Sequence, residues 1–203
     1  MTDSQAALLA LFSRVAYGDN VALPGVWRPD TGFGNLTKYR EFEAVVYTTS
    51  NHGQIVIAFR GSGANLGDWA GANRALVNPG PDWDYQFQSA LNLTEALKRT
   101  YPGATILVTG HSLGGSLAQV AAAMFELDGA AFAPAGAENV VRSGEFGSAA
   151  AAWKINVEDP WTPGADFTNY VVGGSLIGPI TGANVGKDVT IAVDVAEAIS
   201  VVS

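Results

Sequence analysis

The chain has 203 residues, of which 48% are hydrophobic and 15% charged, enough to fold as one domain with a buried core. Its 19 acidic residues outnumber the 11 lysines and arginines, and the resulting net charge of −8 disfavours binding to nucleic-acid phosphates. No cysteine is present, which excludes disulfides, zinc–thiolate sites and cysteine nucleophiles. Histidine occurs only twice, at His52 and His111.

The N-terminal part predicts a helix followed by a β-hairpin. Apolar residues at helical spacing predict an amphipathic helix over residues 4–16. Two β-rich runs, 42–49 and 54–59, are joined by turn residues, which favours a hairpin. The second run is almost wholly apolar, as is typical of a central strand covered on both faces.

The rest of the chain alternates between strand-like and helix-like segments. The predicted elements are a helix from Phe87 that ends at Tyr101-Pro102-Gly103, a strand at 105–109, an alanine-rich helix to Leu127, and short strands at 130–133 and 153–157. This alternation predicts one α/β domain over residues 1–203, with a mostly parallel central sheet flanked by helices. No segment reaches the ~18 uncharged apolar residues of a transmembrane helix, and the N-terminus lacks the basic start of a signal peptide.

The strongest motif is Gly110-x-Ser112-x-Gly114, between the strand at 105–109 and the alanine-rich helix. In a nucleophile elbow, the strand enters the helix through a turn so sharp that the serine side chain stands clear of the sheet. Glycine is needed two residues before and after the serine, because a side chain there would clash with the turn. The pattern alone is weak, and its position between a strand and a helix makes it persuasive.

A second motif, Arg60-Gly61-Ser62, directly follows the apolar strand at 54–59. Serine hydrolases of this architecture hold the oxyanion with one N–H from the residue after the nucleophile and another from a loop after an earlier strand. Leu113 and Ser62 occupy these two positions. We expect Arg60 to be a structural anchor at the strand end.

FRGS at 59–62, DW at 68–69 and VTGHSLGGSLA at 108–118 resemble the class 3 lipases, the fungal-type triacylglycerol lipase family. The resemblance covers residues 5–165. It implies an α/β-hydrolase fold and carboxylic ester hydrolysis by a Ser-Asp-His triad. It also implies Ser112 as the nucleophile, with Ser62 and Leu113 as oxyanion donors.

The acid of the triad should follow a strand downstream of the elbow. Residues 153–157 predict that strand, and acidic residues and a proline-containing loop come next. The matching stretch of the family has an aspartate before such a loop, so Asp159 is our choice, with Glu158 and Asp166 as alternatives. The acid would fix the histidine tautomer and stabilise the imidazolium.

The base of the triad is missing, because no histidine follows Ser112. His111 leaves the turn in another direction, and His52 lies in the hairpin turn, at the wrong end of the strand that leads to Ser62. Three explanations stay open. Our first choice is a longer natural protein that supplies a histidine after Ser203; the others are a partner chain or pseudo-enzyme arrangement, and a weak base such as Glu158 or Asp166.

We therefore expect a serine hydrolase of carboxylic esters, of the lipase, esterase or phospholipase type. The alternative is an interaction domain or fragment, impaired in catalysis, that keeps the hydrolase fold without its histidine. The region between the oxyanion loop and the next helix, which begins with residues 65–69, is short and glycine-rich and has no clear lid helix, which favours soluble or phospholipid-like esters. The aromatic residues Trp83, Tyr85 and Phe87 that follow either line the site or pack in the core. We expect no metal or other cofactor. The family resemblance favours a secreted protein, although no targeting signal is visible in the sequence.

Overall fold

The structure is a computed structural model that describes residues 1–61, 85–157, 166–172 and 182–191. Its helices are α1 (Asp3–Val15), α2 (Gly34–Thr37), α4 (Tyr85–Thr100), α5 (Leu113–Phe125), α6 (Glu138–Val141) and α7 (Gly144–Ala152). Its strands are β1 (Trp27–Pro29), β2 (Lys38–Tyr39), β3 (Phe42–Thr49), β4 (Gln54–Phe59), β5 (Thr105–His111), β6 (Asp128–Phe132), β7 (Phe167–Val172) and β8 (Lys187–Ile191). None of the helices in these ranges is both long and apolar enough to span a membrane.

The described strands form one sheet in the order β1-β3-β4-β5-β6-β7-β8, with β2 paired to β3. From β4 to β8 all neighbours run parallel, whereas β3 pairs antiparallel with both β1 and β4. The sheet is therefore mostly parallel, as the alternation of strands and helices predicts. Parallel strands bring the carboxyl ends of β4 to β8 to one edge, where ligands bind in open α/β sheets.

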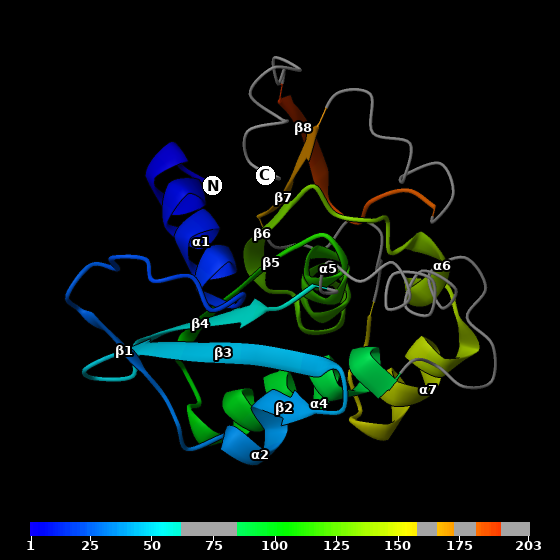
Figure 1. Ribbon diagram of the computed structural model, residues 1–203. Helices are drawn as coiled ribbons and strands as arrows, with labels where there is room; N and C mark the ends of the chain where they lie inside the picture. The colour runs from blue at the N-terminus through cyan, green and yellow to red at the C-terminus, as the bar shows by residue number, and fades with distance from the viewer. Residues whose placement is uncertain (62–84, 158–165, 173–181, 192–203) are drawn as a thin grey trace.

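Helices cover both faces of the sheet (Figure 1). α1 packs on one face against β4, β5 and β6, and α5 packs on the other with α4 beside it. β4 contributes side chains to the core on both faces of the sheet. Ile55, Ile57 and Phe59 point into the core beneath α4 and α5, whereas Val56 and Ala58 point towards α1. All five side chains are fully buried, which explains why this strand is an uninterrupted apolar run.

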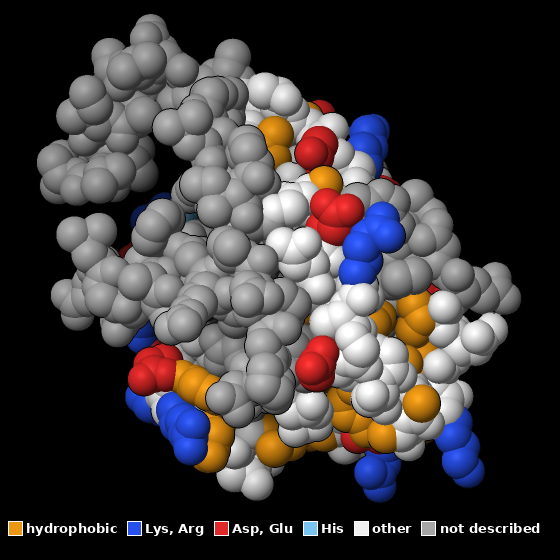
Figure 2. All heavy atoms as spheres, turned by 90° about the vertical axis from the view of Figure 1, so that its right-hand side faces the viewer, with side chains coloured by type: hydrophobic (Ala, Val, Ile, Leu, Met, Phe, Trp, Pro, Cys, Tyr) orange, Lys and Arg blue, Asp and Glu red, His pale blue; other side chains and the backbone are white. Residues whose placement is uncertain are grey.

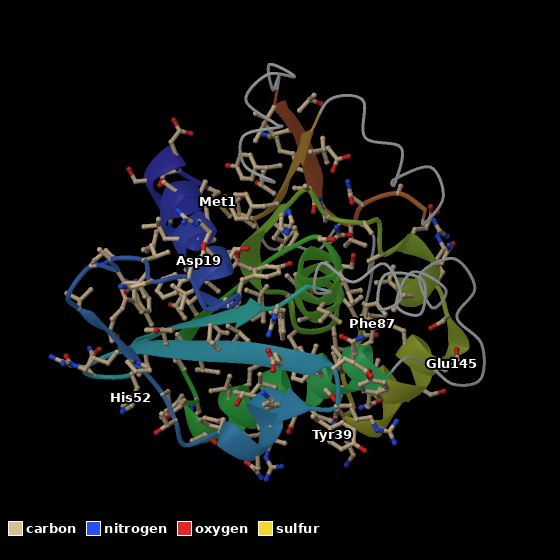
Figure 3. All side chains as sticks on the ribbon, viewed as in Figure 1. Met1, Asp19, Tyr39, His52, Phe87 and Glu145 are labelled. Atoms are coloured by element: carbon tan, nitrogen blue, oxygen red, sulfur yellow. The ribbon has the colours of Figure 1, made fainter. Side chains whose placement is uncertain are left out.

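Most of the predicted elements are confirmed. The helix at 4–16 is α1, which a capping box between Thr2 and Gln5 starts at its N-terminus. The hairpin strands at 42–49 and 54–59 are β3 and β4 with the predicted bounds. Phe87 is fully buried on the inward side of α4 (Figure 3), so this aromatic side chain belongs to the core.

The strand predicted at 153–157 is wrong. α7 ends at Ala152, and the chain then closes a left-handed C-cap: Lys154 has φ 57°, its N–H donates to Ala151 O (3.1 Å), and Ile155 N–H donates to Ala150 O (2.9 Å). Trp153, Ile155 and Val157 alternate with exposed residues because their partly buried side chains pack against the core from a turn. The strands that extend the sheet past β6 are instead β7 and β8, which the sequence analysis missed.

Candidate active site

Ser112 lies in the sharp turn between β5 and α5. Its backbone has φ 55° and ψ −126°, a conformation that non-glycine residues rarely adopt, and its side chain is partly exposed. The Ser112 N–H donates to Phe132 O of β6 (3.0 Å), and Ser112 O accepts from Gly115 N–H (2.9 Å). These bonds hold the turn on both sides. The strained backbone of Ser112 agrees with the sharp strand-to-helix turn that is expected of a nucleophile elbow.

Glycines around Ser112 allow α5 to approach the sheet. A side chain at Gly110 would collide with the carbonyl group of Gly114, and one at Gly114 would collide with Phe59 O of β4. Gly115 has similarly little space, since a Cβ there would lie 2.9 Å from Pro134 Cβ. The flanking glycines are therefore required by close packing of α5, as well as by the turn itself.

Of the two predicted oxyanion donors, the structure describes Leu113. It is the first residue of α5, so its N–H belongs to the free amino end of a 13-residue helix, where negative charge is favoured. Ser62 lies outside the described residues. Gly61, its neighbour, is described, and its backbone lies against the elbow: a Cβ on Gly61 would be 2.6 Å from His111 O and 3.3 Å from Gly114 N.

Arg60 anchors the end of β4, as expected. Its N–H donates to Glu43 O (2.9 Å), and its guanidinium forms an ion pair with the Glu43 carboxylate, which Lys38 also contacts (2.7 Å). The hydrogen bond from Lys38, followed by those of Arg60, lowers the pKa of Glu43. Glu43 therefore stays ionised at neutral pH and ties β4 to β3 beside the site.

Neither histidine of the chain is placed to activate Ser112. His111 Nδ1 lies 3.2 Å from the hydroxyl of Tyr17, and the two rings pack edge to face. Desolvation lowers the pKa of His111, so the imidazole is neutral at pH 7. His52 stacks on Tyr101 before the start of β4 (Figure 3), at the opposite end of the strand from Arg60.

Tyr17 is a residue near the site that the sequence analysis missed. It follows α1, and 94 residues separate it from His111. No local pattern distinguishes it from a packing tyrosine, because only the tertiary fold brings α1 to the elbow.

The structure describes only one of the three candidates for the acid of the triad, Asp166. Asp159 and Glu158 lie outside the described residues, so Asp159 stays a prediction, and the strand that led to its choice does not form. Asp166 precedes β7, its N–H donates to Asp128 Oδ1 (2.7 Å), and its carboxylate forms an ion pair with the amino group of Met1. Asp128 starts β6, so Asp166 lies at the amino ends of the strands, and its assignment as alternative acid or base is wrong.

The part of the chain that the structure describes contains no group of three His, Asp or Glu side chains that could hold a metal ion.

On the side towards which β4 runs, charged side chains of both signs lie among hydrophobic ones (Figure 2). The Ser112 turn and the Leu113 N–H are the described features that the predicted attack on a carbonyl carbon would use.

The sequence profile of the Tle-like phospholipase domain, of the phospholipase-like group, matches residues 10–195. The chain belongs to this family. No curated protein sequence matches it. This membership in a lipase-like family agrees with the resemblance carried by the motifs around Ser62 and Ser112, and it supports ester hydrolysis as the general activity.

Solved lipase structures share the fold. Lip2 lipase from Yarrowia lipolytica superposes with a TM-score of 0.55 at 13% identity, covering 95% of this chain and 80% of that one. A triacylglycerol lipase from Penicillium expansum gives a TM-score of 0.51 at 19% identity, covering 95% and 82%. At these identities the likeness concerns the fold alone, and it confirms the α/β-hydrolase architecture.

Proposed function

We propose that this phospholipase-like domain hydrolyses carboxylic esters of lipids through an acyl-enzyme on Ser112. The observation that carries the proposal is the strained, partly exposed Ser112 between β5 and α5. Phospholipid-type esters are the favoured substrate class, since the matching family is phospholipase-like and the sequence between the predicted oxyanion loop and the next helix is short and glycine-rich.

In the proposed reaction, Ser112 Oγ loses its proton to a base and attacks the acyl carbon. The N–H groups of Leu113 and Ser62 hold the negative oxygen of the tetrahedral intermediate. The intermediate expels the alcohol, which takes up the proton from the base, and leaves the acyl group on Ser112. Water, deprotonated by the same base, then releases the carboxylic acid and restores the serine. Asp159 would orient the base.

We further propose that the base is a histidine outside these 203 residues, in a longer natural chain or a partner protein. His111 is engaged by Tyr17, and His52 is at the other end of β4. An elbow with its oxyanion donors still accelerates the reaction about 10³–10⁴-fold over water without a complete triad. The isolated chain should therefore have weak but measurable activity.

The second candidate function is a non-catalytic interaction domain, and the observation that favours it is the position of both histidines. Added imidazole separates the two functions, because a small base can replace a missing histidine. We would measure hydrolysis of a short-chain p-nitrophenyl ester and a short-chain phosphatidylcholine, with and without imidazole. Ser112→Ala is the test variant, and Ser148→Ala, an exposed serine of α7, is the control.

The proposal expects turnover above background in the unmodified chain, a rise with imidazole, and background rates in Ser112→Ala under both conditions. Ser148→Ala should behave like the unmodified chain. Rates of the unmodified chain equal to those of Ser112→Ala, even in imidazole, would favour the interaction domain.

A further inference from the structure

We infer that Tyr17 is a positioning residue whose hydroxyl group joins His111, two residues before the proposed oxyanion donor Leu113, to Gly61 at the end of β4. The inference rests on the proposed function. It assigns a role at that site to a side chain that lies outside both motifs. The backbone and side chain of His111 and the backbone of Gly61 meet at one atom, the hydroxyl oxygen of Tyr17.

The position of Tyr17 is fixed by the end of α1. Leu9 and Phe12 bury α1 against the sheet, and the Tyr17 N–H donates to Arg14 O (3.0 Å). Gly18 follows in the left-handed region with φ +88°, which suits glycine and ends the helix there. The tyrosine ring is thus held by a helix that packs on β4 and β5, the two strands that lead to the two oxyanion donors.

The Tyr17 hydroxyl contacts both donor segments. It lies 3.3 Å from His111 O and 3.2 Å from His111 Nδ1, and it accepts a hydrogen bond from the Gly61 N–H. Gly61 also has no room for a side chain, because a Cβ would collide with the Tyr17 hydroxyl. His111 directly precedes Ser112 and Leu113, and Gly61 directly precedes Ser62, so one oxygen joins the elbow to the loop after β4.

These contacts use the full capacity of a phenol, which has one hydrogen and two lone pairs. We assign the hydroxyl hydrogen to His111 O, with the lone pairs accepting from Gly61 N–H and from His111 Nδ1–H. Burial raises the pKa of Tyr17, more than the Gly61 N–H and the nearby Arg60 charge lower it, so the phenol is neutral at ordinary pH. Arg60 lies over the same ring at 5.9 Å and in turn pairs with Glu43.

The consequence is catalytic, because an oxyanion hole depends on the spacing of its two N–H groups. Loss of one donor costs about 10²–10³-fold in turnover, and a looser donor costs less. Tyr17→Phe keeps the ring and its packing and removes only the oxygen. We therefore expect kcat to fall about 10-fold while KM stays within about twofold, since the loss arises in the transition state.

Tyr47→Phe is the matched control. The Tyr47 ring packs on Phe12 of α1, with ring centroids 5.2 Å apart, and no hydrogen bond of its hydroxyl is found among the described residues. The readouts are kcat and KM for the p-nitrophenyl ester, the thermal midpoint, and the hydrogen-exchange rate of the Gly61 amide by NMR. The exchange rate needs no activity, so it tests the link even if the chain proves to be no enzyme.

The inference expects faster Gly61 exchange and lower kcat in Tyr17→Phe only, with similar thermal midpoints in the two variants. If the unmodified chain shows no turnover even in imidazole, the proposed function fails, and the Gly61 exchange rate alone decides whether Tyr17 holds this loop. Unchanged Gly61 exchange in Tyr17→Phe overturns the inference. So does unchanged kcat, or a fall in kcat that accompanies a much larger loss of thermal stability than in Tyr47→Phe.

Discussion

At the scale of single residues, the turn at Ser112 depends on the absence of a side chain at Gly114. Gly114 faces Phe59 O and the backbone of Arg60 and Gly61, so it sets how closely the start of α5 can approach β4. The Ser112 conformation and the Leu113 N–H follow from that approach. The sequence motif could predict glycine at 110 and 114 from the turn, but the contact of Gly114 with β4 depends on the fold.

The first prediction concerns this contact. Gly114→Ala should destabilise the chain by about 1–3 kcal/mol, because the added methyl group forces two backbones apart. It should also reduce reaction of Ser112 with ester substrates. Gly147→Ala is the control: nothing lies within 4 Å of its added Cβ, and alanine favours the interior of α7, so a gain of about 0.5–1 kcal/mol is expected. Chemical denaturation measures the free energy of unfolding of both variants. Equal changes in Gly114→Ala and Gly147→Ala would contradict the packing argument.

The second prediction is a pH dependence at Glu43. Lys38 and Arg60 hold the folded-state pKa of Glu43 below its ordinary value of 4.5. The ion pairs therefore add stability above about pH 4.5, and this contribution is lost as the pH falls through the folded-state pKa. Glu43→Gln should have a shallower loss of stability in this acid range, measured by urea denaturation at a series of pH values. Parallel curves for the two proteins would show that the ion pairs contribute nothing.

At the scale of elements, α5 anchors the carboxyl-terminal part of the sheet through a buried glutamine. Gln119 Oε1 accepts from Ala137 N–H (3.2 Å) and Val185 N–H (2.9 Å), and its Nε2 donates to Asn184 Oδ1 (3.0 Å). The side chain is fully buried. One residue of the helix that starts at the elbow thus holds the segment after β6 and the segment before β8.

The third prediction tests this anchor. Gln119→Leu keeps the volume and leaves two buried N–H groups without a partner, each at a cost of about 1–3 kcal/mol. Gln88→Leu is the control, because Gln88 is not fully buried and bonds Asn92 on the same helix (3.0 Å). We expect a large fall in the free energy of unfolding for Gln119→Leu and a small change for Gln88→Leu. A loss for Gln119→Leu no larger than the control's would contradict the anchoring role.

Elements with a strong periodic pattern could be predicted from the sequence. β3 and β4 follow from alternation, an apolar run and turn residues, and α5 follows from an alanine-rich stretch after glycines. The alternation of Trp153, Ile155 and Val157 misled, because a turn with packed side chains has the same pattern as a strand. β7 was missed because Asn169 interrupts its apolar run; that asparagine is buried and donates to Val185 O (2.9 Å).

At the scale of the whole molecule, the parallel order of β4 to β8 gathers the elbow and the loop after β4 at one edge. This edge could be predicted from the two motifs, since each follows a strand. Asp166 could not be excluded from the sequence, because its place at the amino end of β7 depends on a strand that the pattern did not reveal.

The fourth prediction compares the two aspartates. Asp159→Asn should lower ester turnover at least about 10-fold, measured in imidazole-free buffer on the natural full-length chain or complex that supplies the base, because the acid orients that base. Asp166→Asn should leave the rate per folded molecule within about twofold, since Asp166 lies at the opposite edge. A larger loss of turnover in Asp166→Asn would refute this arrangement of the site.

The most direct test of the account is covalent labelling with a fluorophosphonate probe, which reacts with an activated serine, followed by peptide mass spectrometry. With the base that the proposal requires, supplied in the full chain or complex or as added imidazole, Ser112 should acquire a phosphonyl adduct that is absent from Ser112→Ala and retained in Ser148→Ala. An adduct on a different serine, or ester turnover by a chain that never acquires the label at Ser112, would contradict the central claim.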